Sequence, residues 1–268
     1  MSKPRTKPSG PPRRFSADMT DADLLAARLA RGTEFFASRG YAPFPFQLDT
    51  WRAYLSGESG LVNAPTGSGK TYSLVVPILL EGLLPDAGTA AAQEARAAKG
   101  RIKEPEGLRA IWISPIRALT KEIASAAQQA VDGFGLQWRV GVRTGDTPTA
   151  ERAKQKRRPP QILITTPESL HLILSNKDYP ERLSKLRCIV ADEWHELLGT
   201  KRGVQLELGI SRLRGLNPKL KVWGISATIV NLEQGAQVLL GGGSRALRSA
   251  PQEEVGGDPA RSAEAAPQ

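Results

Sequence analysis

Residues Ala64–Thr71 read Ala-Pro-Thr-Gly-Ser-Gly-Lys-Thr, and this glycine-rich stretch constrains the fold of the chain more than any other. A short apolar run precedes it, and an apolar-periodic segment, residues 72–80, follows it. A strand, a glycine-rich turn and a helix in this order are typical of a phosphate-binding loop. The glycines let several backbone N–H groups point into one concavity, and the helix N-terminus adds partial positive charge. The stretch therefore predicts a nucleotide-binding site.

Two side chains at the end of this loop are expected to carry its chemistry. Lys70 is expected to reach the β- and γ-phosphates, and the Thr71 hydroxyl to ligate Mg²⁺. Ala64 stands where the strict pattern has its first glycine, which the turn tolerates if that residue keeps a negative φ. The residues of the loop expected to bind the nucleotide are Thr66, Gly67, Ser68, Gly69, Lys70 and Thr71.

Short apolar runs alternate with amphipathic segments along residues 16–240. Trp112 and Trp223 fall in such runs and are expected to be core residues. Continuous apolar strands separated by helices predict an α/β fold, in which a mostly parallel sheet is covered by helices on both faces and binds its ligand at the carboxyl ends of the strands. We predict strands at 60–63, 110–114, 139–143, 161–165, 187–191 and 221–225.

Residues 16–240 are expected to form one domain, and three segments lack the alternation of apolar runs and amphipathic segments. We expect a disordered basic tail at 1–15, a surface insertion at 86–108 and a second disordered tail at 241–268. No apolar run approaches the roughly 20 residues of a membrane span, and the N-terminus lacks the apolar region of a secretory signal. A single cysteine, Cys188, is typical of reducing compartments, so we expect a cytoplasmic protein without a membrane partner.

The charge balance of the chain is strongly basic. The formal net charge is +10 and the pI is about 9.9, which favours a polyanionic partner such as nucleic acid. The alternative is a charge surplus that serves solubility and lies in the tails, because residues 1–15 alone carry five basic side chains. Charge by itself does not decide between the two.

Two adjacent carboxylates, Asp192 and Glu193, directly follow the apolar run at 188–191, and His195 comes two residues later. A Mg²⁺–nucleotide site needs a carboxylate at the end of a neighbouring strand to hold the metal, and a base to orient the attacking water. We expect Asp192 to take the metal, Glu193 the water, and His195 to sense the γ-phosphate or couple to a later motif. The alternative is a charge pair at a helix N-terminus beside a structural histidine. A phosphate loop upstream in the same sheet favours the catalytic roles.

The segments Gly69–Thr71, Asp192–His195 and Ser226–Thr228, in this order, resemble the first motor domain of a superfamily 2 helicase of the DExH type. The resemblance covers roughly residues 40–240 and implies a RecA-like P-loop NTPase domain. The amino-acid sequences of these motifs are most similar to those of the large helicase-related (Lhr) group, and within it to bacterial ligase-associated DNA-damage-response helicases. This implies ATP and Mg²⁺ as cofactors, a role in DNA repair, single-stranded DNA rather than RNA as the nucleic-acid partner, and a repair ligase or nuclease as a candidate protein partner. The implied catalytic residues are Lys70, Asp192, Glu193 and His195.

Further segments resemble the family's other motifs. Gln47 resembles the glutamine that reads adenine, since an amide both donates and accepts, and Ser226 and Thr228 resemble the motif that couples nucleotide state to strand binding. The residues that the resemblance implies as nucleic-acid contacts are Arg117, Arg143, Thr144, Gly145, Thr165, Thr166 and Ser169. Taken singly, each is more typical of a helix cap or a turn than of a nucleic-acid contact, whereas gathered at the carboxyl end of one sheet they would form a groove. The basic run at 152–158 either extends this groove or is a solvated loop face.

These expectations combine into one function, an ATP-binding motor domain of a DNA helicase or translocase that couples ATP hydrolysis to tracking along a single strand. The family's later motifs, with the arginine fingers of a second motor domain, find no room after residue 228. We therefore expect the second motor domain to be absent, with weak ATP binding, slow hydrolysis and no unwinding by this chain alone. The alternatives are a single RecA-like module that binds nucleic acid or a partner protein, and a fragment of an RNA helicase.

Overall fold

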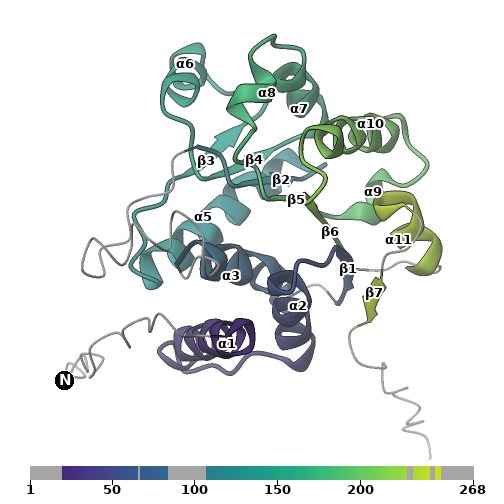
Figure 1. The fold of residues 1–268 in the computed structure, drawn as a ribbon. Helices are drawn as coiled ribbons and strands as arrows, with labels where there is room; N and C mark the ends of the chain where they lie inside the picture. Colours follow the sequence, from purple (N-terminus) through teal and green to yellow (C-terminus); the bar gives the residue numbers. More distant parts are fainter. Residues whose placement is uncertain (1–19, 66, 84–106, 228–231, 242–244, 249–268) are drawn as a thin grey trace, which may run out of the picture.

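The computed structural model describes residues 20–65, 67–83, 107–227, 232–241 and 245–248. Within these ranges, seven strands form one sheet in the order β3-β4-β2-β5-β6-β1-β7, and every neighbouring pair is parallel (Figure 1). The strands are β1 Gly60–Asn63, β2 Ala110–Ile113, β3 Val140–Arg143, β4 Ile162–Thr165, β5 Cys188–Ala191, β6 Lys221–Ser226 and β7 Arg245–Arg248.

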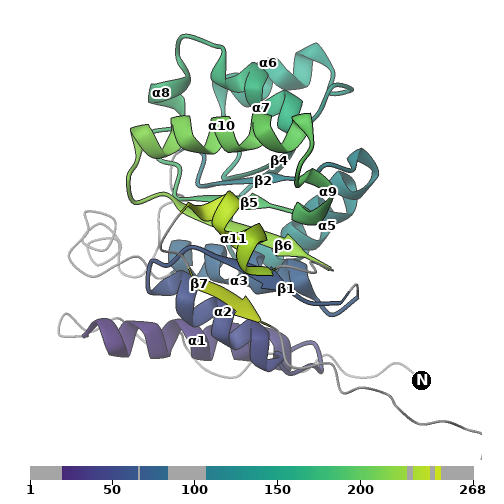
Figure 2. The ribbon, with the colours of Figure 1, turned by 90° about the vertical axis from the view of Figure 1, so that its right-hand side faces the viewer.

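Helices cover both faces of this sheet (Figure 2). One face is covered by α1 Asp21–Ala37, α2 Pro45–Leu55, α3 Lys70–Leu83 and α5 Arg117–Gly133. The other face is covered by α7 Pro167–Leu174, α9 Trp194–Leu197, α10 Lys201–Leu216 and α11 Leu232–Leu240. Helices α6 Thr149–Arg157 and α8 Tyr179–Arg182 lie on the same side, toward β3 (Figure 1). None of the helices in the described ranges is both long enough and apolar enough to cross a membrane.

Strand periodicity explains why the sheet has a core on each face. Successive side chains of a strand point to opposite faces, so Trp112 enters the core beneath α3 and α5, while Ile111 and Ile113 enter the core beneath α7 and α10. Trp112 and Trp223 are fully buried, which confirms their prediction as core residues. The predicted α/β fold with a parallel sheet between two helical layers is confirmed.

The C-terminal prediction is wrong at one point. Residues 245–248, which the sequence placed in a disordered tail, form β7 and pair with β1. Strand pairing uses backbone N–H and C=O groups, which every residue but proline carries, so it leaves little trace in composition. The predicted tail at 1–15 and the rest of the second tail, 249–268, lie outside the described residues.

Two other segments differ from expectation in smaller ways. The basic run at 152–158, for which one of the two alternatives was a solvated loop face, lies mostly in α6. Of the predicted insertion at 86–108, residues up to 106 lie outside the described ranges, while Leu108 is buried in the core under α7 and α10. Leu108, near the predicted end of the insertion, is therefore part of the folded core.

Candidate nucleotide-binding site

The glycine-rich loop connects the carboxyl end of β1 to the first residue of α3. Gly67 and Gly69 have φ angles of 82° and 79°, in the left-handed region that glycine adopts without strain. At Gly69 a side chain would also collide, since a Cβ there would lie 2.9 Å from Nε2 of Gln47. Thr66, predicted to bind the nucleotide, lies outside the described residues. The backbone path of this tight loop therefore requires glycine at positions 67 and 69.

Lys70 is the first residue of α3 and is only 8% exposed. Its Nζ atom is buried and has no hydrogen-bond partner among the described residues. Burial lowers the pKa of the Lys70 ammonium, and the nearby carboxylates of Glu193 and Asp192 oppose that shift. A buried ammonium without acceptors is costly, and the oxygens of a bound polyphosphate would satisfy it. The side chain fits a nucleotide site.

Asp192 follows β5 directly and is 7% exposed. Its carboxylate accepts two hydrogen bonds, one from Nε1 of Trp112 at 3.1 Å and one from the backbone N–H of Glu193 at 3.0 Å. Burial raises the pKa of Asp192 to about 6, although the hydrogen bond from Trp112 lowers it. The carboxylate is held in one orientation at the edge of the loop, which suits a metal ligand.

Glu193 has a left-handed backbone, with φ 45° and ψ 48°, which is uncommon for a residue other than glycine. Its Oε2 atom is buried, accepts no hydrogen bond from the described residues, and lies 3.4 Å from Nδ1 of His195. The same Nδ1 lies 3.0 Å from Oγ of Ser226 at the end of β6. Residues with such an unfavourable backbone conformation are found more often at functional sites, where the surrounding structure holds them in place.

Ser226 joins these parts. Its backbone carbonyl accepts from the N–H of Ala64 at 3.1 Å, so β6 connects the loop after β1 to the segment after β5. The structure thus brings Lys70, Asp192, Glu193 and His195 together at the carboxyl ends of β1, β6 and β5. Thr71 lies half-buried in the first turn of α3. Thr228, predicted to couple with Ser226, lies outside the described residues.

Gln47 sits behind the loop and is 1% exposed. Its Nε2 donates to the carbonyl of Gly69 at 3.0 Å, and its Oε1 accepts from the N–H of Phe44 at 2.8 Å. The amide therefore ties the loop to the aromatic segment before α2. Each end of the amide keeps the capacity for one further hydrogen bond, so its predicted role in reading adenine is compatible with this position.

The predicted nucleic-acid residues follow the other strands of the sheet, β2, β4 and β3. Arg117 begins α5, is exposed, and lies 3.3 Å from the carboxylate of Asp146. Gly145 packs against the Arg117 guanidinium, and the N–H of Thr144 donates to Oγ1 of Thr147 at 2.9 Å. Arg117, Thr144 and Gly145 therefore share one loop surface at the carboxyl end of the sheet.

The hydroxyls predicted to contact nucleic acid are engaged in local structure. Oγ1 of Thr165 donates to the carbonyl of Arg143 at 2.7 Å. Thr166 caps α7 by accepting from the N–H of Ser169, and all three hydroxyl residues are buried. Arg143 does not join Arg117, because its side chain lines a small cavity with Arg182. Any role of these residues in strand binding stays a prediction.

Sequence reasoning missed the role of Trp112. Its apolar strand context predicts only a core residue, and the structure adds a hydrogen bond from its indole to Asp192. Because β2 and β5 are neighbours in the sheet, this hydrogen bond connects β2, the strand that precedes Arg117, to Asp192 at the end of β5. A buried indole needs an acceptor, but the sequence does not say which one.

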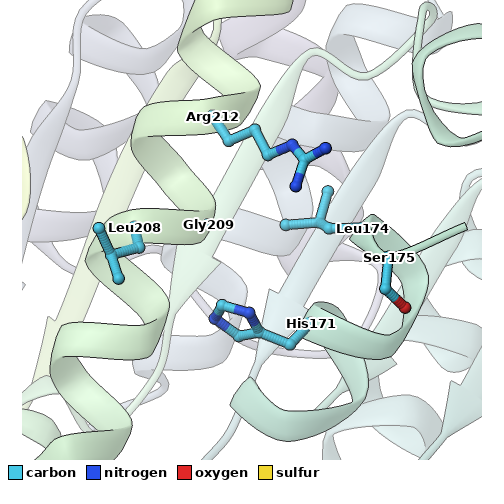
Figure 3. A pocket seen from close by; sticks show the side chains of 6 residues that line it. All are labelled: His171, Leu174, Ser175, Leu208, Gly209 and Arg212. Atoms are coloured by element: carbon cyan, nitrogen blue, oxygen red, sulfur yellow. The ribbon is translucent and has the colours of Figure 1, made fainter. Parts of the chain in front are cut away.

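A separate pocket of about 330 Å³ lies between α7 and α10 (Figure 3). It is lined by His171, Leu174, Ser175, Leu208, Gly209 and Arg212. Nε2 of His171 lies 2.7 Å from the carbonyl of Gln205, and Nε of Arg212 donates to the Tyr179 hydroxyl at 2.8 Å. Its polar side chains thus have partners already, in contrast to Lys70 and Glu193.

This arrangement can be compared with known proteins. The family described as DEAD/DEAH box helicase matches residues 44–234, well over half of the chain. The chain belongs to the DEAD/DEAH box helicase family. It is 37% identical over 214 residues to the Lhr helicase/uracil glycosylase of Escherichia coli, a match that covers 76% of this chain and 13% of that protein. It is 36% identical over 194 residues to the ATP-dependent helicase Lhr-Core of Methanothermobacter thermautotrophicus, covering 69% of this chain and 21% of that one.

A solved structure of Mycobacterium smegmatis helicase Lhr bound to ssDNA and AMP-PNP has the same fold. The TM-score is 0.64 at 33% identity, over 82% of this chain and 28% of that one. The RecA-like fold is therefore confirmed, and the chain is a helicase motor domain homologous to the Lhr helicases. It spans about an eighth to a quarter of the length of these relatives.

Proposed function

We propose that this domain binds ATP with Mg²⁺ and serves as the motor domain of a DNA helicase or translocase that tracks along single strands during repair. The observation that carries the proposal is the buried Lys70 ammonium, which lacks an acceptor among the described residues and lies near Asp192 and Glu193. The phosphates of a nucleotide held by the loop would supply the missing acceptors.

The proposal gives each side chain a task. The Thr71 hydroxyl and the Asp192 carboxylate would hold Mg²⁺, which offsets the charge of the phosphates. Glu193 would accept a hydrogen bond from the attacking water, because its buried Oε2 has an open position. His195 and Ser226 would transmit the state of the site through their 3.0 Å contact to the neighbouring strand.

The aromatic segment before α2 supports an adenine site. The ring of Phe44 is 54% exposed and stacks with Phe46 at a centroid distance of 6.0 Å. The N–H of Phe44 is bound by Gln47, so an exposed apolar ring lies beside a buried amide. A flat base can stack on such a ring while its edge bonds to the amide.

DNA is favoured over RNA because the Mycobacterium smegmatis relative was solved with ssDNA. Arg117 and the backbone of Thr144 and Gly145 are the described groups best placed to meet phosphates. RNA stays the second candidate, since backbone contacts alone do not distinguish the two. A cytoplasmic location and a ligase or nuclease partner stay predictions from the sequence.

We further propose that residues 1–268 alone bind ATP weakly, hydrolyse it slowly and do not unwind a duplex. Helicase motors of this kind hydrolyse ATP between two such domains, and an arginine finger from the second contributes about 10³–10⁵ in rate. Among the described residues there is one such sheet.

Binding and hydrolysis measured on this chain test the proposal. We expect Lys70→Met to lose MgATP binding, and Glu193→Gln to keep binding but lose the slow hydrolysis that single-stranded DNA stimulates. Stimulation by DNA and RNA oligonucleotides of the same length distinguishes the two substrates. MgATP binding that is equal in Lys70→Met and the parent chain would refute the nucleotide site. Hydrolysis that persists in Glu193→Gln would refute the assigned base.

A further inference from the structure

We infer that helix α6 presents a second phosphate-binding surface, formed by Lys154, Arg157 and Arg158, which holds the nucleic-acid backbone after it leaves the loop around Gly145. This inference rests on the proposed function and extends it to a part of the chain that no motif covers. We call these three residues the α6 basic surface.

Helix α6 and its C-cap carry much of the excess charge of the protein. Residues 149–158 contain five Lys and Arg and one Glu, which gives this segment a net charge of +4. The whole chain has a net charge of +10. A large part of the surplus therefore lies on one short segment, which a general solubility effect does not require.

The charges beneath the surface are poorly compensated. The half-buried guanidinium of Arg143 lies near enough to Arg182 and Arg152 to be affected by both charges, and within the described ranges no carboxylate pairs with it. Burial lowers the pKa of Arg143, and the charges of Arg182 and Arg152 lower it further. Arg152 donates to the carbonyls of Thr144 and Gly145, which carry no net charge. Like charges gathered in this way favour a bound polyanion.

One carboxylate serves two cations here. Asp178 lies 3.3 Å from Nζ of Lys156 and 3.9 Å from a guanidinium nitrogen of Arg182. This shared contact ties α6 to α8 and leaves the outer face of α6 to its remaining basic side chains. The Lys154 side chain is 71% exposed and lies 3.8 Å from a carboxylate oxygen of Glu151, and Arg157 and Arg158 are exposed too.

Helix α6 is held against the loop at Thr144 and Gly145, which is part of the predicted nucleic-acid surface. Gln155 is buried and donates to the carbonyl of Val142 on β3 at 3.0 Å. Arg152, one turn earlier, holds the loop at Gly145 at 2.7 Å, the same loop that packs against Arg117. A strand that meets Arg117 and Gly145 therefore finds α6 next along the edge of the sheet (Figure 1). Basic side chains on a rigid element beside the groove fit phosphates without reading bases.

The test compares two triple variants of the same change in charge. Lys154→Gln, Arg157→Gln and Arg158→Gln together remove the α6 basic surface and spare Lys156, which links α6 to α8. Arg31→Gln, Arg52→Gln and Lys219→Gln remove three exposed charges elsewhere. Binding is measured with single-stranded oligonucleotides of increasing length, and with a duplex, at several salt concentrations.

For each protein, affinity should rise with oligonucleotide length up to a limit. We expect this limiting length to be greater for the parent chain than for the α6 variant. For long single strands, the slope of log affinity against log salt should fall by about 2 in the α6 variant, since each lost phosphate contact removes ~0.7. The control variant should keep the slope of the parent. MgATP binding should be equal in all three proteins, which shows that the variants fold.

Three other outcomes would overturn the inference in different ways. If the α6 variant and the control behave alike on single strands and on the duplex, α6 does not hold phosphates, while the proposed function stands. If the parent chain binds no nucleic acid at any length, the proposed function fails together with the inference. A loss confined to the duplex would assign the surface to the paired region ahead of the strand, and would refute its contact with the single strand.

Discussion

The two ends of the parallel sheet treat buried charge in opposite ways. At the carboxyl end, Nζ of Lys70 is buried without a hydrogen-bond partner among the described residues, and Oε2 of Glu193 accepts no hydrogen bond but lies 3.4 Å from Nδ1 of His195. At the amino end, Glu81 lies 2.8 Å from Nζ of Lys221 and 3.4 Å from Nε of Arg187. Glu81 also accepts from the Tyr54 hydroxyl at 3.0 Å.

Helix α3 connects the two ends, since it begins at Lys70 and carries Glu81 in its last turn. Removing one partner of a buried charge pair destabilises the folded state, whereas a buried charge without a partner costs free energy until a ligand arrives. The difference separates residues that hold the domain together from residues that act. Substitutions at the amino end should therefore change stability, and those at the carboxyl end should change binding.

The largest effect on stability is expected for Glu81→Gln. This change leaves Lys221, whose side chain is 9% exposed, without its carboxylate. Removing one partner of a buried pair costs about 3 kcal/mol in the free energy of unfolding, and urea denaturation measures it. MgATP affinity should not change.

Glu34→Gln is the matched control for Glu81→Gln. Glu34 pairs with Arg31 at 2.8 Å on the surface, where both side chains are well exposed. Exposed pairs contribute at most about 1 kcal/mol. Equal losses in the two variants would mean that the amino-end network does not stabilise the domain.

Lys70→Met should produce the reverse pattern. MgATP affinity is expected to fall about 100-fold, or ~2.7 kcal/mol, as measured by titration with a fluorescent ATP analogue. The free energy of unfolding should stay the same or rise, because a buried ammonium without an acceptor is removed. A loss of stability as large as that of Glu81→Gln would show that the ends do not differ. Lys121→Met, at an exposed position on α5, serves as the control.

The sequence predicted which residues lie at the carboxyl end of the sheet, and there is a physical reason for this. The left-handed glycines, the first lysine of α3 and the carboxylates after β5 occupy positions that the backbone path dictates, so short motifs suffice to find them. The parallel sheet follows in the same way from apolar runs separated by helices.

No short motif predicts the Glu81 contacts at the amino end of the sheet. Glu81 and Lys221 are 140 residues apart in the chain, and their pairing depends on where α3 ends above β6. Trp112 is a similar case, because an apolar strand predicts its burial but not the acceptor of its indole. Backbone pairing of β7 leaves no apolar period either. Contacts made by tertiary packing therefore lay beyond the sequence.

A smaller effect is expected for Trp112→Phe at the carboxyl end. The change removes one of the two hydrogen bonds to the Asp192 carboxylate, and a bond to a charged group contributes about 1.5 kcal/mol. ATP affinity in the presence of Mg²⁺ should fall about tenfold, while affinity measured in EDTA should not change. Trp223→Phe is the control, since Trp223 is also fully buried but its indole donates to the carbonyl of Glu58. A similar fall in both variants would mean that Trp112 acts only through packing.

The smallest effect is expected for Tyr54→Phe at the amino end. Glu81 loses one hydrogen bond but keeps Lys221 and Arg187, and the Lys221 ammonium still lies over the ring, 3.8 Å from its centroid. The free energy of unfolding should fall by about 1 kcal/mol, with no change for Tyr41→Phe, whose side chain is exposed. Alkylation of Cys188, which lies in contact with Tyr54, gives a second readout. Burial raises the pKa of this thiol to about 12, so it reacts only when the domain opens. A loss of ~1 kcal/mol should speed alkylation about fivefold, and a rate that does not change would place Cys188 outside the network.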